Sequence, residues 1–218
     1  MTALRYLMNC QFLLGLIFSN GVWSAEMQSN EPQSFCAVAN VQDASGEGAI
    51  LLQYAFEGGT HDLAMRLSDK TSDIKRVTFG GSLAPECHYK ALALARGGDW
   101  GWHLAWVAND AAILSYARMD GVAWVSSPTK KLSKNAHIVG QPLIVTFEKK
   151  VWIVWIEADG SLNKIYAVYS DDEGRSWEEA KLLIQTSATV GQLFSDIRAH
   201  NPYLVWGEKQ EATLLPER

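Results

Sequence analysis

Val151-Trp152-Ile153-Val154-Trp155 is an apolar segment that ends on an aromatic residue, and this pattern returns at regular intervals along the chain. The four segments that share it are Ala49–Tyr54, Trp102–Trp106, Val151–Trp155 and Pro202–Trp206. Their last residues lie at positions 54, 106, 155 and 206, so the intervals are 52, 49 and 51 residues. A nearly constant period of this size predicts a repeat architecture in which each repeat is one supersecondary unit.

The unit that runs from residue 141 to residue 184 shows the content of one repeat most clearly. Strands are predicted over Pro142–Phe147, Val151–Ile156 and Lys164–Tyr169, and a fourth strand begins near Trp177. The turns between them are short and polar, and one contains an Asp-Gly pair, which favours a hairpin. Four short antiparallel strands in about 50 residues describe a propeller blade. We therefore expect an all-β fold, a β-propeller of four-stranded antiparallel blades with about four such units.

The second strand of this unit is apolar on both faces. Val151, Ile153 and Trp155 alternate with Trp152, Val154 and Ile156. A sheet with one solvated face alternates apolar with polar residues, so this pattern predicts that sheets pack on both sides. The alternative fold is a β-sandwich, which also has short strands at regular intervals. A sandwich does not repeat its whole pattern at one period, and the propeller is therefore favoured.

Composition and charge narrow the class of protein. Hydrophobic residues make up 48% of the chain and charged residues 20%, which is typical of a globular domain. The formal net charge is −5, and Lys130-Lys131 and Lys149-Lys150 are isolated pairs rather than a basic cluster. Phosphate backbones are bound by clustered Lys and Arg, so no nucleic-acid partner is expected.

The first 25 residues have the pattern of a signal peptide. Arg5 precedes the apolar run Phe12–Phe18, and small residues follow at Ser24 and Ala25. We expect export, periplasmic or secreted, and a mature propeller domain over residues 26–218 without a membrane span. An uncleaved anchor is the alternative, although the apolar run is short for a bilayer.

Two cysteines remain after that segment. Cys36 and Cys87 form an even pair in an oxidising compartment, which predicts a disulfide between them. Two buried free thiols are the alternative. The five histidines show no metal-ligand spacing, so neither a metal nor a cofactor is expected.

Ser170–Trp177 fits the pattern Ser-x-Asp-x-Gly-x-Ser/Thr-Trp and resembles the Asp-box of bacterial neuraminidase (BNR) repeats in the sialidase superfamily. Such a turn uses Asp172 as an acceptor of hydrogen bonds across the loop and Gly174 at positive φ. Ser170 and Ser176 are expected to close the loop, and Trp177 to pack into the blade. The segment Arg118–Trp124 is a weaker version that keeps the Asp, the Gly and the Trp.

The resemblance implies the fold of the chain, but it does not imply a catalytic activity. In that family the Asp-box lies at the periphery of the blade, away from the active site. Family sialidases grip the substrate carboxylate with three arginines and use an Asp acid/base and a Tyr nucleophile. The Phe/Tyr-Arg-Ile-Pro segment of that family is absent and no arginine triad can be assigned, so catalytic residues are not predicted.

The expected function is that of an exported, sialidase-like propeller that binds a glycan or a protein without catalysis. The alternatives are an exo-sialidase-type glycoside hydrolase (reduced, truncated or completed by oligomerisation) and a structural remnant without a ligand. Ligand-binding candidates lie on or beside the first strands, which line the channel of a propeller; they are His88, Lys90, Asp196, Arg198 and His200. The alternative interpretation is that these polar residues face the water of the channel and bind no ligand.

The length of the chain does not determine the number of blades. Six blades of about 50 residues, the family's usual number, need about 300 residues, and 193 follow position 25. A four-bladed ring, a partial propeller completed by a partner such as a second copy, and a truncated product are the alternatives. An open propeller exposes apolar blade faces, which predicts association.

Overall fold

The computed structural model describes residues 38–42, 48–70, 73–81, 89–98, 101–108, 112–134, 137–198, 201–206 and 210–214. These residues form strands and turns, so the expectation of an all-β chain is confirmed for the part that the structure describes. Within that part, no helix is long and apolar enough to cross a membrane. The predicted signal peptide and the residues Cys36, Cys87, His88 and His200 lie outside the described ranges, and what was expected of them stays a prediction.

The strands form four antiparallel sheets in chain order, which we name sheets A to D. Sheet A contains β1 (Val38–Gln42), β2 (Gly48–Ala55), β3 (His61–Leu67) and β4 (Lys75–Arg76). Sheet B contains β5 (Tyr89–Arg96), β6 (Gly101–Ala108), β7 (Leu114–Asp120) and β8 (Lys130–Lys131). Sheet C contains β9 (Ile138–Phe147), β10 (Lys150–Asp159), β11 (Leu162–Ser170) and β12 (Lys181–Thr186). Sheet D contains β13 (Leu193–Arg198), β14 (Asn201–Trp206) and β15 (Gln210–Thr213).

The repeat found in the sequence corresponds to one strand of each sheet. The four apolar segments that end on an aromatic residue lie in β2, β6, β10 and β14, the second strand of each sheet. In sheet C the predicted strands agree with β9, β10 and β11, and the fourth strand, β12, begins at Lys181 rather than near Trp177. The tight turns take left-handed backbone angles, with φ of 53° at Glu148 and 60° at Gly160.

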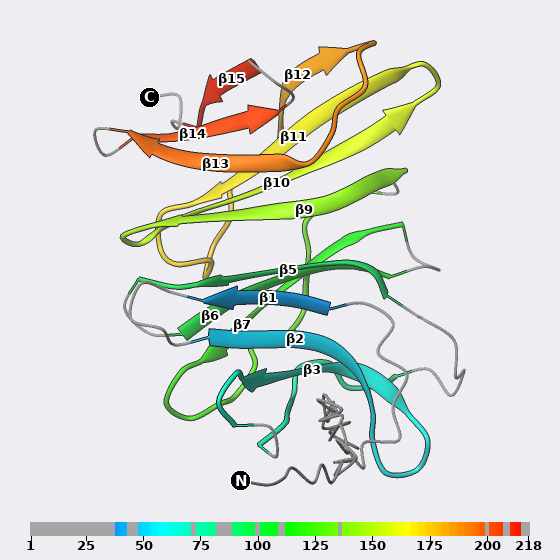
Figure 1. Cartoon of the computed structure of the whole chain (residues 1–218), viewed down its shortest axis with the longest axis vertical. Coiled ribbons are helices and arrows are strands. Elements are labelled where there is room, and N and C mark those ends of the chain that lie inside the picture. The colour runs from blue at the N-terminus through cyan, green and yellow to red at the C-terminus, as the bar shows by residue number, and fades with distance from the viewer. Residues whose placement is uncertain are drawn as a thin grey trace, which may run out of the picture. The chain divides into compact units, whose positions relative to one another are not determined.

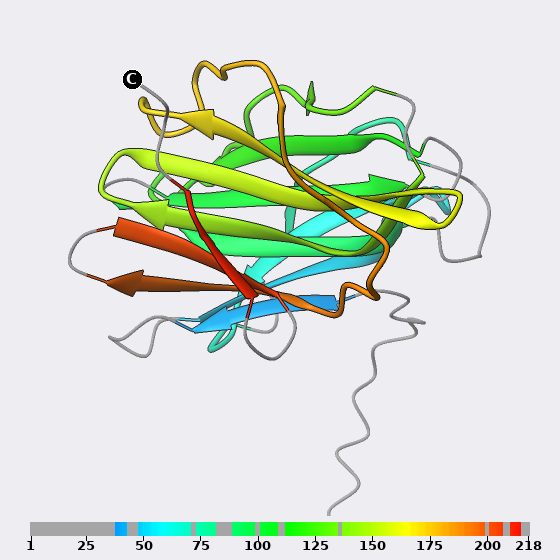
Figure 2. The same cartoon turned by 90° about the horizontal axis from the view of Figure 1, so that it is seen from above.

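Apolar side chains hold neighbouring sheets together. Three core clusters lie between sheets A and B, between B and C, and between C and D. Members from the two sides of each boundary are Leu51 and Trp102, Tyr116 and Trp155, and Trp152 and Trp206. The sheets therefore follow one another in chain order (Figure 1). Viewed from above, the strands of successive sheets cross at an angle (Figure 2), as twisted sheets do when they pack face to face.

Strand β10 shows why the sheets stack on both sides. Its residues Val151, Ile153 and Trp155 belong to the cluster between sheets B and C. The alternate residues, such as Trp152 and Val154, belong to the cluster between sheets C and D. Both faces of the strand are buried, as its apolar pattern predicts, and a two-layer sandwich does not account for four stacked sheets.

The first strands of the sheets lie next to one another. β5 contacts both β1 and β9, and β9 also contacts β13. This arrangement, with first strands inside and later strands outside, is that of propeller blades. Among the described residues no core cluster joins sheet D to sheet A, so these four sheets form a row in which no closed ring is detected.

Candidate functional site

The turn that follows β11, residues Ser170–Trp177, is closed by its own side chains. Asp172 Oδ1 accepts a hydrogen bond from Ser170 Oγ at 2.8 Å. Its two carboxylate oxygens also accept from the backbone N–H of Ser176, at 2.8 and 3.1 Å, and Oδ2 accepts from Ser176 Oγ at 2.7 Å. Ser170 Oγ in turn accepts from the N–H of Gly174 at 2.8 Å, and Gly174 has φ of 75°. Every bond in this set joins residues at most four positions apart, so the turn is specified locally.

These bonds decide the ionisation of Asp172. Partial burial acts to raise the pKa of its carboxyl group, but the hydrogen bonds from Ser176 and Ser170 outweigh it and lower the pKa to about 2. The carboxylate is therefore ionised and fully engaged in the turn at any physiological pH. Its role is structural, because its oxygens are already occupied by neighbouring donors.

The weaker copy of the motif forms a related turn after β7. Asp120 Oδ1 accepts hydrogen bonds from the N–H groups of Val122 at 2.8 Å and Ala123 at 2.5 Å. These two backbone bonds lower the pKa of Asp120. Trp124 packs against the cluster between sheets A and B, as Trp177 packs against the cluster between sheets B and C. The two tryptophans therefore occupy equivalent places in successive sheets.

A buried polar pair lies beneath the turn 170–177. His103 of β6 is 1% exposed, and its Nδ1 lies 2.7 Å from the hydroxyl of Tyr116 on β7. Burial, and to a lesser degree the positive charge of Arg118, lowers the pKa of His103 to about 4. Burial also raises the pKa of the Tyr116 hydroxyl. Both groups are consequently neutral near pH 7, and the ring of Tyr116 packs edge-on against Trp177 with centroids 4.8 Å apart.

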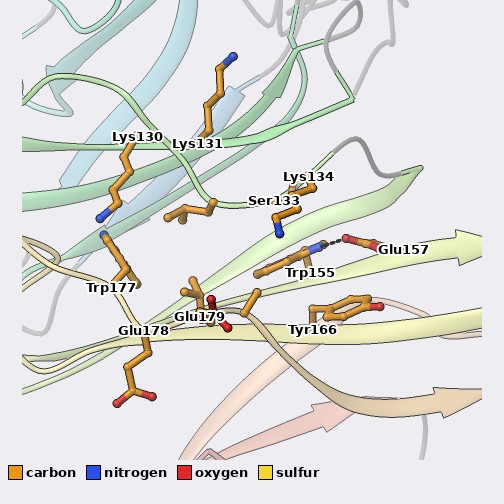
Figure 3. Close-up of a pocket in the computed structure, with 13 residues that line it drawn as sticks. Lys130, Lys131, Ser133, Lys134, Trp155, Glu157, Tyr166, Trp177, Glu178 and Glu179 are labelled. Atoms are coloured by element: carbon orange, nitrogen blue, oxygen red, sulfur yellow. Dashed lines mark hydrogen bonds between the residues drawn. The ribbon is translucent and has the colours of Figure 1, made fainter.

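A cavity lies between the outer part of sheet B and the outer part of sheet C (Figure 3). It has a volume of about 420 Å³. One wall comes from β8 and the residues after it, and the other comes from β10, β11 and the connection to β12. The lining residues used below are Lys130, Lys134, Glu157, Tyr166, Trp177 and Glu179.

Aromatic rings form one side of this cavity. The rings of Trp155 and Tyr166 are stacked, with centroids 5.7 Å apart and an angle of 17° between their planes. Trp155 is buried and donates its indole N–H to Glu157 Oε1 at 2.7 Å, which fixes the orientation of its ring. Tyr166 and Trp177 are partly exposed and lie on the cavity wall.

Charged side chains complete the wall. Lys134 extends toward the Trp155 ring, and the carboxylate of Glu179 lies between Trp177 and Trp155 in the view of Figure 3. Lys131 and Glu178 point away from the middle of the cavity in the same view. The cavity thus combines partly exposed aromatic rings with cationic and anionic groups, which are the kinds of side chain that orient polar ligands in small-molecule sites.

Of the residues predicted from the sequence to bind a ligand, the three that the structure describes, Lys90, Asp196 and Arg198, do not line this cavity. Lys90 is exposed near the start of β5, where the pairing of β5 with β6 is irregular. Asp196 and Arg198 are exposed on β13, and Arg198 is bound to Asp196 at 2.6 Å and to Glu211 at 2.8 Å. Arg198 also lies over the ring of Tyr203, 5.2 Å from its centroid.

The structure therefore brings Asp196 and Arg198 together but does not bring Lys90 to them. Lys90 lies near the beginning of the first strand of its sheet and Arg198 at the end of the first strand of another, and these first strands run in the same direction (Figure 1). No group of three His, Cys, Asp or Glu side chains suited to a metal ion occurs within the described ranges.

Sequence reasoning missed the cavity residues Lys134, Glu157, Tyr166 and Glu179. Their strands were predicted, but nothing in the local pattern distinguishes Tyr166 from a residue that packs between blades. Lys134 and Tyr166 are 32 positions apart and meet only because sheets B and C stack.

No family model and no curated protein matches the sequence. Among solved structures, the chain is similar to a GH43 β-1,3-galactosidase solved with galactodeoxynojirimycin. The TM-score is 0.51 at 12% identity, over 84% of this chain and 70% of that chain. It also matches a bifunctional GH43-CE protein of Bacteroides eggerthii, with a TM-score of 0.44 and 13% identity over 80% of this chain and 22% of that one. A third match is a Bombyx mori GH32 β-fructofuranosidase in complex with sucrose, with a TM-score of 0.43 and 13% identity over 79% and 41% of the two chains.

The galactosidase similarity shows that the chain has a fold of the β-propeller type found in glycoside hydrolases. The sialidase resemblance read from Ser170–Trp177 finds no support in these comparisons. The physical reason is that the hydrogen bonds of this turn are all local, so the motif describes a hairpin connection and not the family around it.

Proposed function

We propose that this chain is a non-catalytic carbohydrate-binding module of the propeller type, and that the cavity between β8 and the β11–β12 connection is its binding site. The observation that carries the proposal is the aromatic wall of the cavity. Tyr166 and Trp177 present ring surfaces, and Lys134 and Glu179 supply polar groups beside them.

Sugars match this arrangement chemically. A pyranose ring has an apolar C–H face and a rim of hydroxyl groups, so it packs on an aromatic ring while its hydroxyls bind charged side chains. The cavity volume of about 420 Å³ lies within the range of about 300–1,000 Å³ that is usual for small-molecule sites. The ring of Trp155, on the neighbouring strand and the same face of sheet C, stacks against the ring of Tyr166, which holds the tyrosine in place without a ligand.

The test is calorimetric titration of the purified chain with a panel of soluble neutral and acidic oligosaccharides. We expect at least one class to bind, and Tyr166→Ala, Lys134→Ala and Glu179→Ala each to weaken binding several-fold. Lys70→Ala, at an exposed turn lysine far along the chain from the cavity lining, is the matched control and leaves affinity unchanged. The proposal fails if no saccharide binds, or if the cavity variants bind as tightly as the control.

The second candidate function is that of a glycoside hydrolase, in the sialidase-type form expected from the sequence or with another specificity. Three glutamates line the cavity, Glu157, Glu178 and Glu179, and Glu178 points away from its middle in Figure 3. A pair of carboxyl groups is the usual requirement for glycosidic cleavage. One oxygen of Glu157 already accepts the indole N–H of Trp155, which favours a positioning role for this residue.

Activity assays separate the two functions. The hydrolase candidate predicts release of a fluorescent aglycone from a sialoside or another glycoside, and loss of that release in Glu179→Gln. The binding module predicts no turnover of any glycoside that it binds.

A further inference from the structure

A second cavity occupies the same place in the fold as the cavity proposed as the sugar site, one sheet boundary earlier in the chain. Its volume is about 350 Å³, and it is lined by residues 77–79, which follow β4, and by residues 126–129, which precede β8. The first cavity is likewise lined in part by β8 and the residues after it, and by residues 177–180, which precede β12. In both places the fourth strand of one sheet, or the segment after it, meets the connection that leads into the fourth strand of the next sheet.

The two connections are attached to their sheets in the same way. The N–H of Ser127 donates to the carbonyl oxygen of Arg118 on β7 at 2.7 Å, and the N–H of Glu178 donates to the carbonyl oxygen of Tyr169 on β11 at 2.9 Å. In each connection the donor comes after the tryptophan that packs against a core cluster. The repeat of the chain therefore builds the same kind of cavity at two successive sheet boundaries.

Hydrogen bonds hold the walls of the second cavity in place. Ser126 Oγ donates to the carbonyl oxygen of Val77 at 3.0 Å, which joins the connection of sheet B to the segment after β4. Thr78 Oγ1 donates to Asp62 Oδ1 at 2.9 Å and accepts from the N–H of Leu63 at 3.0 Å. Both walls are thus fixed without a ligand, as is usual for small-molecule sites.

An exposed aromatic ring forms part of this cavity. Phe79 is 72% exposed, and the guanidinium of Arg76 lies 5.3 Å from its ring centroid. The same guanidinium lies 4.7 Å from the ring centroid of Phe56, and Arg76 Nε donates to the carboxylate of Asp62 at 2.9 Å. Arg76 is therefore held beside Phe79, and the remaining surface of this ring is open to a ligand.

The two cavities differ in charge. Three lysines and three glutamates line the first cavity, whereas none of the described residues that line the second is charged. The guanidinium of Arg76 behind Phe79 is paired with the carboxylate of Asp62, which is 1% exposed. The polar side chains of the second cavity are all hydroxyls, those of Thr78, Ser126, Ser127 and Thr129.

These groups match a neutral sugar unit. A sugar presents a C–H face that packs on an aromatic ring, which Phe79 supplies. A hydroxyl both donates and accepts hydrogen bonds, so the exposed hydroxyl of Thr129 can pair with a sugar hydroxyl in either sense. The volume of about 350 Å³ lies at the lower end of the range of about 300–1,000 Å³ for small-molecule sites.

We infer that the second cavity is a separate binding site for a neutral sugar unit, so that the chain binds saccharides at two successive sheet boundaries. The inference rests on the proposed carbohydrate function and extends it from one site to two. The two cavities have no described lining residue in common, so each site can be removed by itself. Two sites on one chain raise the affinity for a surface that carries many copies of a sugar, without any new contact.

Equilibrium dialysis with labelled neutral disaccharides counts the molecules bound per chain. Lactose, cellobiose, maltose and diacetylchitobiose are each brought to saturation against the full chain. We expect at least one of them to bind at two molecules per wild-type chain, at one in Tyr166→Ala, at one in Phe79→Ala and at none in the double variant. In Tyr166→Ala the remaining affinity should stay constant as salt is raised, because no charged side chain of the described lining is there to be screened.

Two further variants serve as controls. Phe79→Tyr keeps an aromatic ring and should retain the second site. Val122→Ala shortens an apolar side chain that is 91% exposed and lines neither cavity, so it should bind two molecules like the wild type. Circular dichroism of each variant at the assay temperature shows whether a loss of binding is a loss of fold.

The outcomes separate this inference from the proposed function. One molecule per wild-type chain, lost in Tyr166→Ala and kept in Phe79→Ala, overturns the second site and leaves the first standing. The reverse pattern supports the second site and overturns the first. Binding of acidic saccharides alone overturns the neutral second site but not the proposed function. Failure of every saccharide to bind overturns both.

Discussion

The buried imidazole of His103 should make this protein lose stability as the pH falls from about 6.5 to about 4. His103 is 1% exposed and its pKa in the folded chain is about 4, against 6.5 for an unperturbed histidine. Burial is the main cause, since the low-polarity surroundings disfavour the charged ring, and the charge of Arg118 adds to it.

Proton binding by the folded and unfolded chains decides whether the free energy of unfolding rises or falls with pH. Below pH 6.5 the unfolded chain takes up a proton on this histidine, whereas the folded chain does not until about pH 4. The stabilising contribution is therefore fully present above pH 6.5 and is lost progressively down to pH 4. The two pKa values differ by about 2.5, which corresponds to about 3 kcal/mol at 1.4 kcal/mol per unit. A marginally stable domain has about 5–15 kcal/mol in total, so the loss is easily measured.

Urea unfolding at pH 7, 6, 5 and 4.5 is the assay, followed by tryptophan fluorescence. The variant is His103→Gln, because glutamine does not titrate and keeps a partner for the Tyr116 hydroxyl. We expect the variant to be less stable at pH 7 but to lose about 2 kcal/mol less than the wild type between pH 7 and pH 5. The matched control is His137→Gln, at an exposed histidine, which should keep the pH dependence of the wild type.

The reasoning is refuted if His103→Gln retains the acid sensitivity of the wild type. The loss would then come from other groups. Asp172 does not account for it, because its pKa of about 2 places its own loss of stability below the ordinary Asp value of 3.8.

Three further predictions concern the turns and the stacked sheets. Asp172→Asn should cost about 1–2 kcal/mol in the free energy of unfolding, since charged hydrogen bonds become neutral ones, and a cost near zero by urea titration would contradict the account of the turn. Gly174→Ala should cost far more than Gly160→Ala, because both have positive φ but only the Cβ at 174 would lie 2.0 Å from the Tyr116 hydroxyl; similar losses in melting temperature would refute the close packing. Ile153→Ala should cost about 2–5 kcal/mol, as for a fully buried residue in the core between sheets B and C, and a loss below 1 kcal/mol would show that β10 is not packed on that face.

The amino-acid pattern determined the secondary structure and the stacking of the sheets. The aromatic-ended segments at about 50-residue intervals are the second strands of the four sheets. Strand β10, which is apolar on both faces, is buried between two neighbouring sheets, as its pattern predicts. The turn 170–177 could also be predicted from the sequence, because Asp172, Ser170 and Ser176 are close in sequence and form hydrogen bonds with one another.

Only the tertiary structure decided where a ligand site lies. The cavity joins Lys134 after β8 to Tyr166 on β11, so its wall is assembled from two sheets. Periodicity reports which residues are apolar and how they alternate, but it does not report which outer edges meet once sheets stack and twist. The buried pair His103 and Tyr116 also depends on the tertiary structure, because the main cause of the lowered pKa of His103 is its burial, which the local sequence does not specify.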